Sequence, residues 1–451
     1  MSELIEEIAG LLWGPPTILL LLGTGLYLTV RLRFVQVRRL RGGFRALARA
    51  SEQEAGEISP GRALSVALAA TIGTGNIAGV ATAIAMGGPG AVFWMWITAV
   101  VGMATKFAES SLGVFYRVHD PAGGYVGGPM YYIERALGPR WKPLAVLFAI
   151  FTVMTTMGTG NLAESNAVAD TLEYSLRHVF GHEPGEAGRW IRLGIGVLYG
   201  GLVWLVIIGG VKRIGAVAVR LVPAMALLYV VGALVVLALH AEAVPGALAL
   251  IVRSAFEPVA ATGGFAGATV AAALRFGVAR GMFSNEAGLG TGPIAHAAAR
   301  TNDPVRQGSV ALIEPLLDTL VVCTMTALVI IATGVWTSGA SGAELTTMAF
   351  RDAMPGLGVV AVTLSLIVFS FTSVIGWSYY GERCVLYLSN ARWLMPYRVL
   401  FCLALPLGAA MKLDLVWALA DASNALMAVP NLIALIALAG TISRIERRSP
   451  V

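Results

Sequence analysis

Charged residues and cysteine are scarce in this 451-residue chain. Asp, Glu, Lys and Arg make up 13% of the residues, whereas soluble domains contain about 25%. This scarcity excludes an ordinary water-soluble protein. The few cysteines stand far apart in apolar segments, which excludes a disulfide framework or a cysteine metal site and indicates small buried side chains. They are Cys323, Cys384 and Cys402.

Signatures of catalysis and secretion are also missing. We find no Walker motif, no dinucleotide-binding glycine pattern in a convincing context and no nucleophile elbow. His119 and His296 have no partner at a metal-ligand spacing. The acidic start, with Glu3, Glu6 and Glu7, lacks the positive region of a cleaved signal peptide. We therefore expect neither an enzyme nor an organic cofactor.

Apolar residues make up 57% of the chain. Apolar runs of about 20 residues, each enough to span a bilayer as a helix, recur along its whole length. The sequence thus predicts an all-α polytopic membrane protein with about eleven transmembrane helices. We place them at 11–31, 61–86, 88–116, 142–172, 191–210, 213–239, 265–299, 307–334, 356–386, 395–412 and 414–441.

Basic residues predict the orientation, because Lys and Arg concentrate at cytoplasmic loops. With the Arg-rich segment 31–62 inside, 23 of the 32 Lys and Arg residues fall inside and 6 outside. The N-terminus is then outside and the C-terminus cytoplasmic. The sequence pI of 9.3 thus fits an anionic leaflet and needs no nucleic-acid partner.

Ten of the eleven predicted helices divide into two sets of five, which must insert with opposite orientation. We therefore predict an inverted repeat. Its parts are an extra N-terminal helix with a basic linker (1–60), a first repeat (61–240), a second repeat (241–443) and a cytoplasmic tail (444–451).

Each predicted repeat begins with a glycine-rich interruption of an apolar segment. These are "GTGNIAG" at Gly73–Gly79 and "RGMFSNEAGLGTGP" at Arg280–Pro293. Non-helical backbone at membrane depth is tolerated only where protein or a water-filled cavity satisfies it, and paired interruptions indicate a transporter site. Free N–H groups at a restarted helix attract a carboxylate, and free carbonyls can ligate a hard cation. The alternative is that the glycines only permit close helix packing.

Four motifs together resemble the alanine or glycine:cation symporter family, the sodium:alanine symporters. They are "GGPGAVFWMWITAVVG" (Gly87–Gly102), "GGPMYYIERALG" (Gly127–Gly138), "RGMFSNEAGLGTGPIAHAAA" (Arg280–Ala299) and "GWSYYGER" (Gly376–Arg383). The resemblance implies a LeuT-type 5+5 inverted repeat with broken first and sixth core helices. It also implies uptake of small neutral amino acids such as alanine and glycine, driven by Na+ or H+, with Na+ favoured. We expect a monomer to function in the cell membrane.

Two positions depart from the family pattern. Glu164 stands where family members often carry Gln, in "GTGNLAESNAVAD" (Gly158–Asp170). This acid would alter ion coupling or pH dependence. The second departure, "GTGP" at Gly290–Pro293 where "GSAP" is common, is expected to be mild.

The resemblance also implies residue roles at the substrate site. The N–H groups of Thr74 and Gly75 would hold the substrate carboxylate, beside the amides of Asn76 and Asn166. Two rings would wall the pocket and leave room for a methyl side chain, although aromatic residues in membrane helices can equally be packing. These rings are Phe283 and Trp377. Asn161 is interpreted either as a further site residue or as an interhelical hydrogen-bond donor.

The implied sodium site combines the first interruption with a later helix. The carbonyls of Ala69 and Ile72 would face the hydroxyls of Thr372 and Ser373. The alternative for these hydroxyls is hydrogen bonding to carbonyls one turn back along their own helix.

Acidic residues within apolar segments are functional candidates, because their burial is costly. We expect Glu109 to pair with Lys106 three residues away, and Glu286 to cap N–H groups of the restarted helix. Glu164 is a possible coupling group. The full set is Glu109, Glu164, Asp170, Glu286, Glu314, Asp318 and Asp421.

Other functions remain as alternatives. Within transport, the substrate would be serine, a D-amino acid or a small amide, or the coupling ion H+. A channel would need pore-lining rings, usually from symmetric subunits, and a membrane enzyme would need a nucleophile–base pair or a metal cluster. Neither pattern is visible in the sequence.

Overall fold

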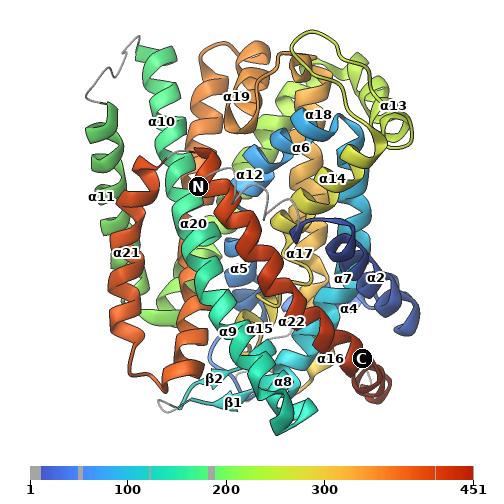
Figure 1. The fold of residues 1–451 in the computed structure, drawn as a ribbon, viewed down its shortest axis with the longest axis vertical. Coiled ribbons are helices and arrows are strands. Elements are labelled where there is room, and N and C mark those ends of the chain that lie inside the picture. Colours follow the sequence, from blue (N-terminus) through green and yellow to red (C-terminus); the bar gives the residue numbers. More distant parts are fainter. Residues whose placement is uncertain (1–11, 49–53, 121–122, 181–187, 412, 450–451) are drawn as a thin grey trace.

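The computed structural model describes residues 12–48, 54–120, 123–180, 188–411 and 413–449. The helices run mainly parallel to one long axis and form a barrel-like bundle (Figure 1). The first half contains α2 (Pro15–Arg31), α3 (Val35–Arg38), α4 (Leu40–Ala48), α5 (Pro60–Thr71), α6 (Val80–Gly87), α7 (Gly90–Phe115), α8 (Pro129–Leu137), α9 (Lys142–Met157), α10 (Glu164–Phe180), α11 (Gly188–Ile207) and α12 (Gly210–Leu239).

The second half contains α13 (Val244–Ser254), α14 (Val270–Asn285), α15 (Gly292–His296), α16 (Pro304–Ala311), α17 (Ile313–Pro315), α18 (Thr324–Ala332), α19 (Gly342–Ala353), α20 (Leu357–Ser389), α21 (Leu394–Ala410) and α22 (Leu413–Arg448). Short 3₁₀ turns are η2 (Pro139–Trp141), η5 (Ala241–Ala243) and η7 (Val335–Thr337). A two-stranded antiparallel ribbon, β1 (Val118–His119) with β2 (Tyr125–Val126), pairs Val118 with Val126 and His119 with Tyr125.

Seven of the described helices are long and apolar enough to cross a membrane, or eight if the bent pair α5–α6 counts as one span. The sequence predicts eleven. The difference falls on shorter helices: α14 has 16 residues, and α2 and α21 have 17 each. The polytopic helical class is confirmed, while the number of spans stays a prediction. The predicted first span begins at residue 11, which lies outside the described residues.

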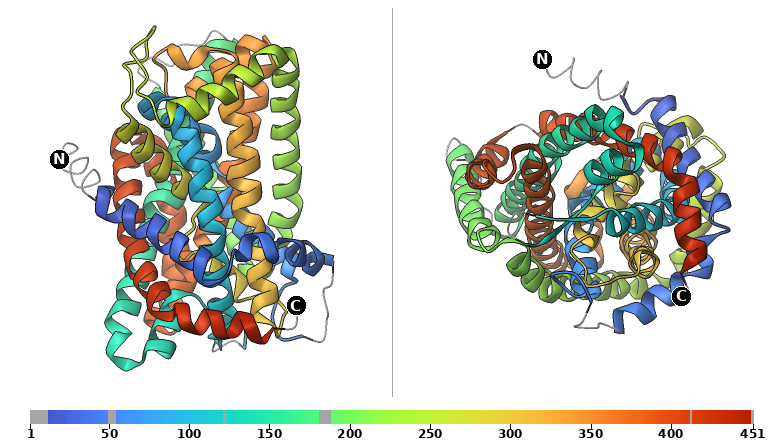
Figure 2. Two further views of the ribbon diagram at one scale, coloured as in Figure 1. Left: turned by 90° about the vertical axis from the view of Figure 1, so that its right-hand side faces the viewer. Right: turned by 90° about the horizontal axis from the view of Figure 1, so that it is seen from below.

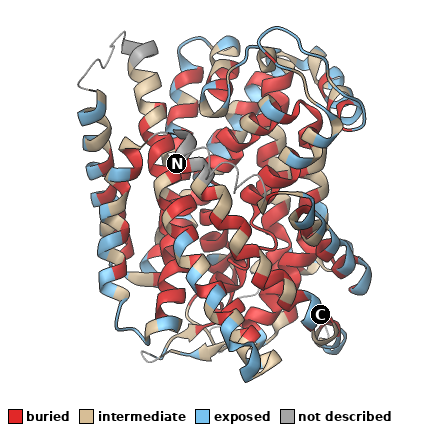
Figure 3. Ribbon diagram, viewed as in Figure 1, coloured by how far each residue is buried: buried red, intermediate tan, exposed pale blue. Residues whose placement is uncertain are grey.

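Exposed residues lie along the outer helices of the bundle (Figure 3), and many of them are large and apolar. Leu198, Leu227 and Leu403 are each more than 60% exposed on outer helices. A water-soluble protein would not place so many large apolar groups on its surface. The outer surface is therefore suited to lipid, as the composition predicts.

The interrupted helix α5–α6 lies inside the bundle, where α5 packs against α12, α15 and α20 (Figures 1 and 2). Small residues allow this close approach. A Cβ atom added to Gly376 of α20 would lie 2.9 Å from the backbone nitrogen of Ala70 in α5. Gly376 therefore lets α20 pack directly against the interrupted helix.

Three π-helical segments surround that centre. They are η1 (Gly75–Gly79), η3 (Gly158–Ala163) and η6 (Leu316–Cys323). A π-helical turn carries an extra residue, redirects the side chains that follow and is frequent at functional sites. The backbone irregularities thus gather where the interrupted helix passes through the protein.

Candidate functional site

The first interruption is a true break in the helix. Helix α5 ends at Thr71, Ile72 is extended with ψ of 93°, and the axis bends by 52° before α6. The Gly73 N–H donates to the side-chain oxygen of Asn76 at 2.9 Å. Thr74 and Asn76 are fully buried. The break is therefore held inside the protein, as exposed backbone at membrane depth requires.

Asn76 connects the first break to an acid from the second half of the chain. Its side-chain nitrogen donates to Asp318 Oδ1 at 2.6 Å. Ser284 and Thr319 donate their hydroxyls to Asp318 Oδ2, each at 2.7 Å. All of these side chains are buried. We call Asn76, Ser284, Asp318 and Thr319 the Asp318 cluster; it joins η1, α14 and η6.

Sequence reasoning assigned no role to Ser284, Asp318 or Thr319. Asp318 did stand out as an acid within an apolar segment, and Ser284 lies within the second glycine-rich interruption. The missing information was the partner: residues 76 and 318 are far apart in sequence, and no helical period relates them. Only the packing of η6 against η1 shows that they meet.

Glu164 lies on another side of the same break. The Thr74 hydroxyl donates to Glu164 Oε1 at 3.1 Å, the Ser370 hydroxyl donates to the backbone carbonyl of Glu164 at 3.1 Å, and Ser373 approaches the same face of the break as the Glu164 carboxylate. Glu164 is the first residue of α10, directly after the π-helical segment η3. It is 2% exposed. We call Glu164, Thr74, Ser370 and Ser373 the Glu164 cluster.

The residues expected to form the sodium site divide in two groups. The Ser373 hydroxyl reaches α5 and donates to the carbonyl of Ala70 at 2.9 Å, one residue beyond Ala69. The Thr372 hydroxyl instead donates to the Phe369 carbonyl at 2.9 Å, within its own helix. Ala69 and Ile72 are buried at the end of α5. The back-bonding alternative therefore describes Thr372, whereas Ser373 faces the break.

The two predicted ring walls occupy different positions. The Phe283 ring covers the first break, because a Cβ atom added to Gly75 would lie 3.1 Å from its Cδ1 atom. Trp377 packs on Gly160 of η3, whose missing side chain makes room for the indole. Both rings are buried. Phe283 is thus the ring in direct contact with the predicted carboxylate-binding turn.

Asn161 of η3 and Asn166 of α10 both donate hydrogen bonds to α21 or the residue that follows it. The Asn166 side chain donates to the carbonyls of Gly408 at 2.9 Å and Met411 at 2.8 Å. Asn161 donates to the Phe401 carbonyl at 2.6 Å. Asn161 therefore forms the interhelical hydrogen bond that was its alternative interpretation. The structure does not bring Asn166 to the first break, although the resemblance implies a substrate contact there.

The second interruption contains a left-handed residue. Helix α14 ends at Asn285, Glu286 has φ of 54°, and α15 begins at Gly292. The Glu286 carboxylate accepts the Thr291 hydroxyl at 2.5 Å. We expected it to cap backbone N–H groups of the restarted helix. The described contact is instead to the side chain of the residue that precedes α15.

The expected pair of Lys106 with Glu109 is wrong. Lys106 Nζ lies 2.9 Å from Glu314 Oε2, and all atoms of both side chains are buried. Glu109 Oε1 accepts from Asn431 at 2.5 Å and from the Gly290 N–H at 3.2 Å. His296 Nε2 contacts the other oxygen of Glu314. A spacing of three residues allows an ion pair within one helix. In the structure, however, Lys106 pairs with Glu314 and Glu109 accepts from Asn431, both of which lie on other helices.

Two further acids pair with arginines. Arg280 contacts Asp421 at 2.6 Å, and Arg192 contacts Asp170 at 2.9 Å. Asp421 and Asp170 do not lie at the first break, where Asp318 and Glu164 lie. Among the described residues, no group of three or more His, Cys, Asp and Glu side chains could hold a metal ion.

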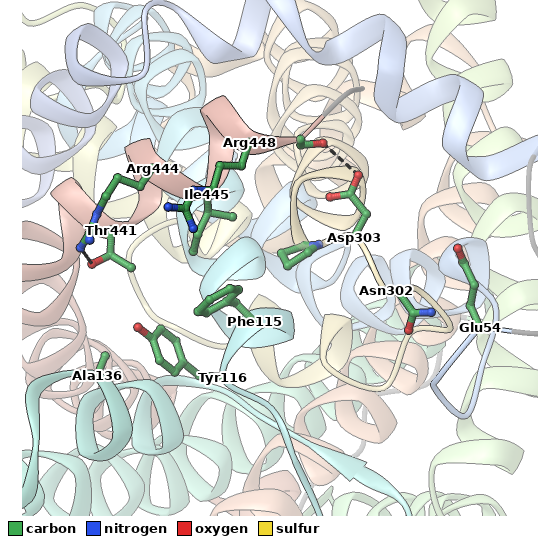
Figure 4. A pocket seen from close by; sticks show the side chains of 12 residues that line it. Glu54, Phe115, Tyr116, Ala136, Asn302, Asp303, Thr441, Arg444, Ile445 and Arg448 are labelled. Carbon is green, nitrogen blue, oxygen red and sulfur yellow. Dashed lines mark hydrogen bonds between the residues drawn. The ribbon is translucent and has the colours of Figure 1, made fainter.

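A cavity of about 700 Å³ lies away from the breaks, between the ends of α7 and α22 and the start of α16 (Figure 4). Phe115, Tyr116, Asp303, Arg444 and Arg448 are among its lining residues. None of the predicted site residues lines this cavity. We therefore locate the candidate site at the breaks and not in this surface pocket.

Comparison with known proteins matches residues 1–448 to the model of the sodium:alanine symporter family. The sodium/alanine symporter AgcS of Methanococcus maripaludis is 43% identical over 448 residues, covering 98% of this chain and 95% of that protein. The probable sodium/glutamine symporter GlnT of Bacillus subtilis is 39% identical, covering 97% and 89%.

The crystal structure of MhsT in complex with L-phenylalanine has the same fold, with a TM-score of 0.64 at 12% identity over 88% of this chain and 93% of that chain. The LeuT-type fold class expected from the resemblance is thus supported by structure. The family and these relatives are transporters and not enzymes. The chain belongs to the sodium:alanine symporter family and is a multi-pass membrane transporter.

Proposed function

We propose that this protein is a Na+-coupled symporter that takes up alanine and glycine by alternating access. The observation that carries the proposal is the Asp318 cluster, which joins the first break to the helix that enters the second break. Asn76 and Ser284 both donate to the Asp318 carboxylate. One buried acid is thus hydrogen-bonded to both broken helices, which are the expected walls of a midplane site.

A bound cation would compensate the charge of Asp318. Among the described residues, no Lys, Arg or His forms an ion pair with this carboxylate. An uncompensated charge at membrane depth is costly. Carboxylate and hydroxyl oxygens, which Asp318, Ser284 and Thr319 supply here, are ligands for a hard cation. Na+ bound here would both neutralise Asp318 and hold the two breaks in one arrangement.

The substrate would bind at the start of η1. The N–H groups of Thr74 and Gly75 are positioned at a helix start, where a carboxylate is favoured. The Phe283 ring next to Gly75 restricts the room left for the side chain. These features support a small neutral amino acid. Serine, a D-amino acid or the glutamine carried by a relative, and H+ in place of Na+, are the alternatives.

An entrance to the site is suggested by a cavity of about 360 Å³ between α10, α11 and α19. Thr347 of α19 lines this cavity, and the neighbouring Thr346 donates its hydroxyl to the Ile77 carbonyl of η1 at 3.0 Å. Helix α19 therefore separates the cavity from the first break. By the predicted orientation, with the N-terminus outside and the C-terminus cytoplasmic, this cavity opens outward.

We propose that the monomer is the functional unit. The driving force would be the membrane potential and the Na+ gradient. Each positive charge that enters contributes about 2.3 kcal/mol per 100 mV. The same structure gives no support to a channel, because the broken helices hold closely packed buried side chains and not a ring-lined pore.

Uptake into proteoliposomes tests the proposal. With pH clamped, an inward Na+ gradient is expected to accumulate radiolabelled L-alanine above the level reached with equal K+ on both sides. Unlabelled glycine should compete strongly, serine less and leucine little, because the Phe283 ring restricts the room beside Gly75. Accumulation that follows an imposed proton gradient and ignores Na+ would contradict Na+ coupling. Preferred uptake of glutamine would contradict the substrate.

A further inference from the structure

The cavity between α7, α16 and α22 has a chemistry of its own, apart from the breaks (Figure 4). Its volume of about 700 Å³ is large enough to hold a small organic group. Its walls combine arginines, acids and aromatic rings. The proposed transport of Na+ and alanine gives this cavity no role, so its occupant has to be inferred from the walls.

Two arginines of α22 line the cavity and have no acidic partner. Arg444 and Arg448 are four residues apart, which places them on one face of the helix. Figure 4 shows both side chains on the cavity side of α22. Arg444 donates to the Thr441 hydroxyl at 3.2 Å. In the part of the chain that the structure describes, no carboxylate forms an ion pair with either arginine. Both positive charges are therefore available to an anion.

The two acids that line the same cavity already have partners. Asp303 begins α16 and accepts the backbone N–H groups of Val305 at 2.9 Å and Arg306 at 3.3 Å. It also accepts the Ser449 hydroxyl at 2.9 Å. Glu54 forms an ion pair with the Arg306 guanidinium. The helix start and Arg306 thus compensate both acids, and the two arginines of α22 determine that the cavity favours a negative charge.

The cavity lies where two apolar helices reach the membrane surface. The apolar helix α7 ends at Phe115, and the apolar part of α22 ends at Arg448. The Phe115 ring is half exposed and packs edge-on against Tyr116, with 4.9 Å between the ring centroids. Aromatic rings are typical of the boundary between lipid and water. One side of the cavity is therefore apolar and the other is positively charged.

We propose that this cavity binds the headgroup of an anionic phospholipid. Arg444 and Arg448 would donate to the phosphate oxygens, which the planar guanidinium group matches with two parallel hydrogen bonds. The glycerol part of the lipid would lie on the Phe115 ring. A free phosphate ion would satisfy the arginines but would leave that ring unused. By the predicted orientation the cavity faces the cytoplasmic leaflet, where anionic lipids are abundant.

The proposed lipid site adjoins the chain segments attached to both broken helices. Asp303 lies in the cavity wall and follows the segment that leaves α15. In that segment the Arg300 N–H donates to the Ile58 carbonyl at 2.7 Å, and the Thr301 N–H donates to the Ala55 carbonyl at 2.9 Å. These bonds join it to the residues that precede α5. A lipid bound against α22 would therefore stabilise one arrangement of these segments, and transport would depend on it.

Retention of lipid by the purified protein tests the site without any transport. Phosphatidylglycerol and phosphatidylcholine are titrated together in detergent and counted on the protein by native mass spectrometry. We expect the wild type to retain phosphatidylglycerol in preference, and Arg444→Gln and Arg448→Gln each to weaken this retention about fivefold. Arg447→Gln is the matched control. It removes the same charge from an exposed position on the same helix, outside the cavity lining, and should behave as the wild type.

Phe115→Ala separates a lipid from a free phosphate ion. It is expected to weaken the retention of phosphatidylglycerol, whereas inorganic phosphate should not displace the lipid. Displacement by inorganic phosphate, with no effect of Phe115→Ala, would overturn the lipid as occupant. Equal retention of the two lipids by the wild type, or an equal loss in Arg447→Gln, would overturn the site itself.

Alanine uptake shows whether the bound lipid affects transport. We expect faster uptake by the wild type and by Arg447→Gln in vesicles that contain phosphatidylglycerol than in vesicles of phosphatidylcholine alone. Arg444→Gln/Arg448→Gln should lose this difference. A wild type that takes up alanine equally fast in both kinds of vesicle would overturn the effect on transport.

Discussion

Replacing Asp318 with Asn is expected to reduce Na+-driven alanine uptake by at least about 100-fold, the largest effect of any single substitution at the site. The hydroxyls of Ser284 and Thr319 and the amide of Asn76 all donate to this one carboxylate. Hydrogen bonds to a charged group contribute about 1.5–3 kcal/mol each, and about 1.4 kcal/mol changes an equilibrium tenfold. If Asp318 binds Na+ as we propose, removing its charge also weakens the binding of the ion.

The measurement is uptake over a range of Na+ concentrations. Weaker ion binding predicts that high Na+ restores part of the activity in Asp318→Asn. Asn76→Ala removes both the donor to Asp318 and the acceptor of the Gly73 N–H, so Na+ should not rescue it. Asp352→Asn, at an exposed position, is the matched control. Near-normal uptake by Asp318→Asn at low Na+ would remove Asp318 from the ion site.

Replacing Lys106 with Met is expected to destabilise the protein by about 3–5 kcal/mol, because it leaves buried acids without their cation. Lys106 and Glu314 are fully buried and 2.9 Å apart. His296 contacts the same carboxylate, and Glu109 lies on the helix of Lys106, held by Asn431. The pair joins α7 to α17, so its loss separates helices that pack beside the second break.

The free energy of unfolding and the melting temperature in detergent measure this effect. The double variant Lys106→Met/Glu314→Gln removes both charges and should recover part of the lost stability. Arg253→Ala breaks an exposed pair with Glu257 and is expected to leave the melting temperature nearly unchanged, because exposed ion pairs contribute little to stability. Equal stability of Lys106→Met and the wild type would show that Glu314 does not need this cation.

Much of the fold was predictable because membrane helices leave a strong signal. The long apolar segments correspond to helices such as α7, α12 and α20. The glycines near residue 73 predicted a break in the helix. Gly73 and Gly75 stand next to the amide of Asn76 within an apolar segment, and a regular membrane helix does not need this combination.

Partners between helices were not predictable. A helical period places Glu109 one turn from Lys106, but it does not show that Glu314 lies closer to that lysine. Asn166 gives a second reason. Its expected substrate contact rested on the family resemblance, which does not specify the hydrogen-bond partners that the side chain finds in this protein. Asn166 accordingly contacts α21.

Binding couplings are reciprocal, so the most direct test of the proposed symport is to drive Na+ with alanine. Proteoliposomes hold equal Na+ on both sides at a clamped pH, and an inward alanine gradient is applied while labelled Na+ is followed. Symport predicts that labelled Na+ accumulates inside above its outside concentration, and that Asp318→Asn abolishes this accumulation. Entry of alanine with no net movement of Na+ would contradict Na+ coupling.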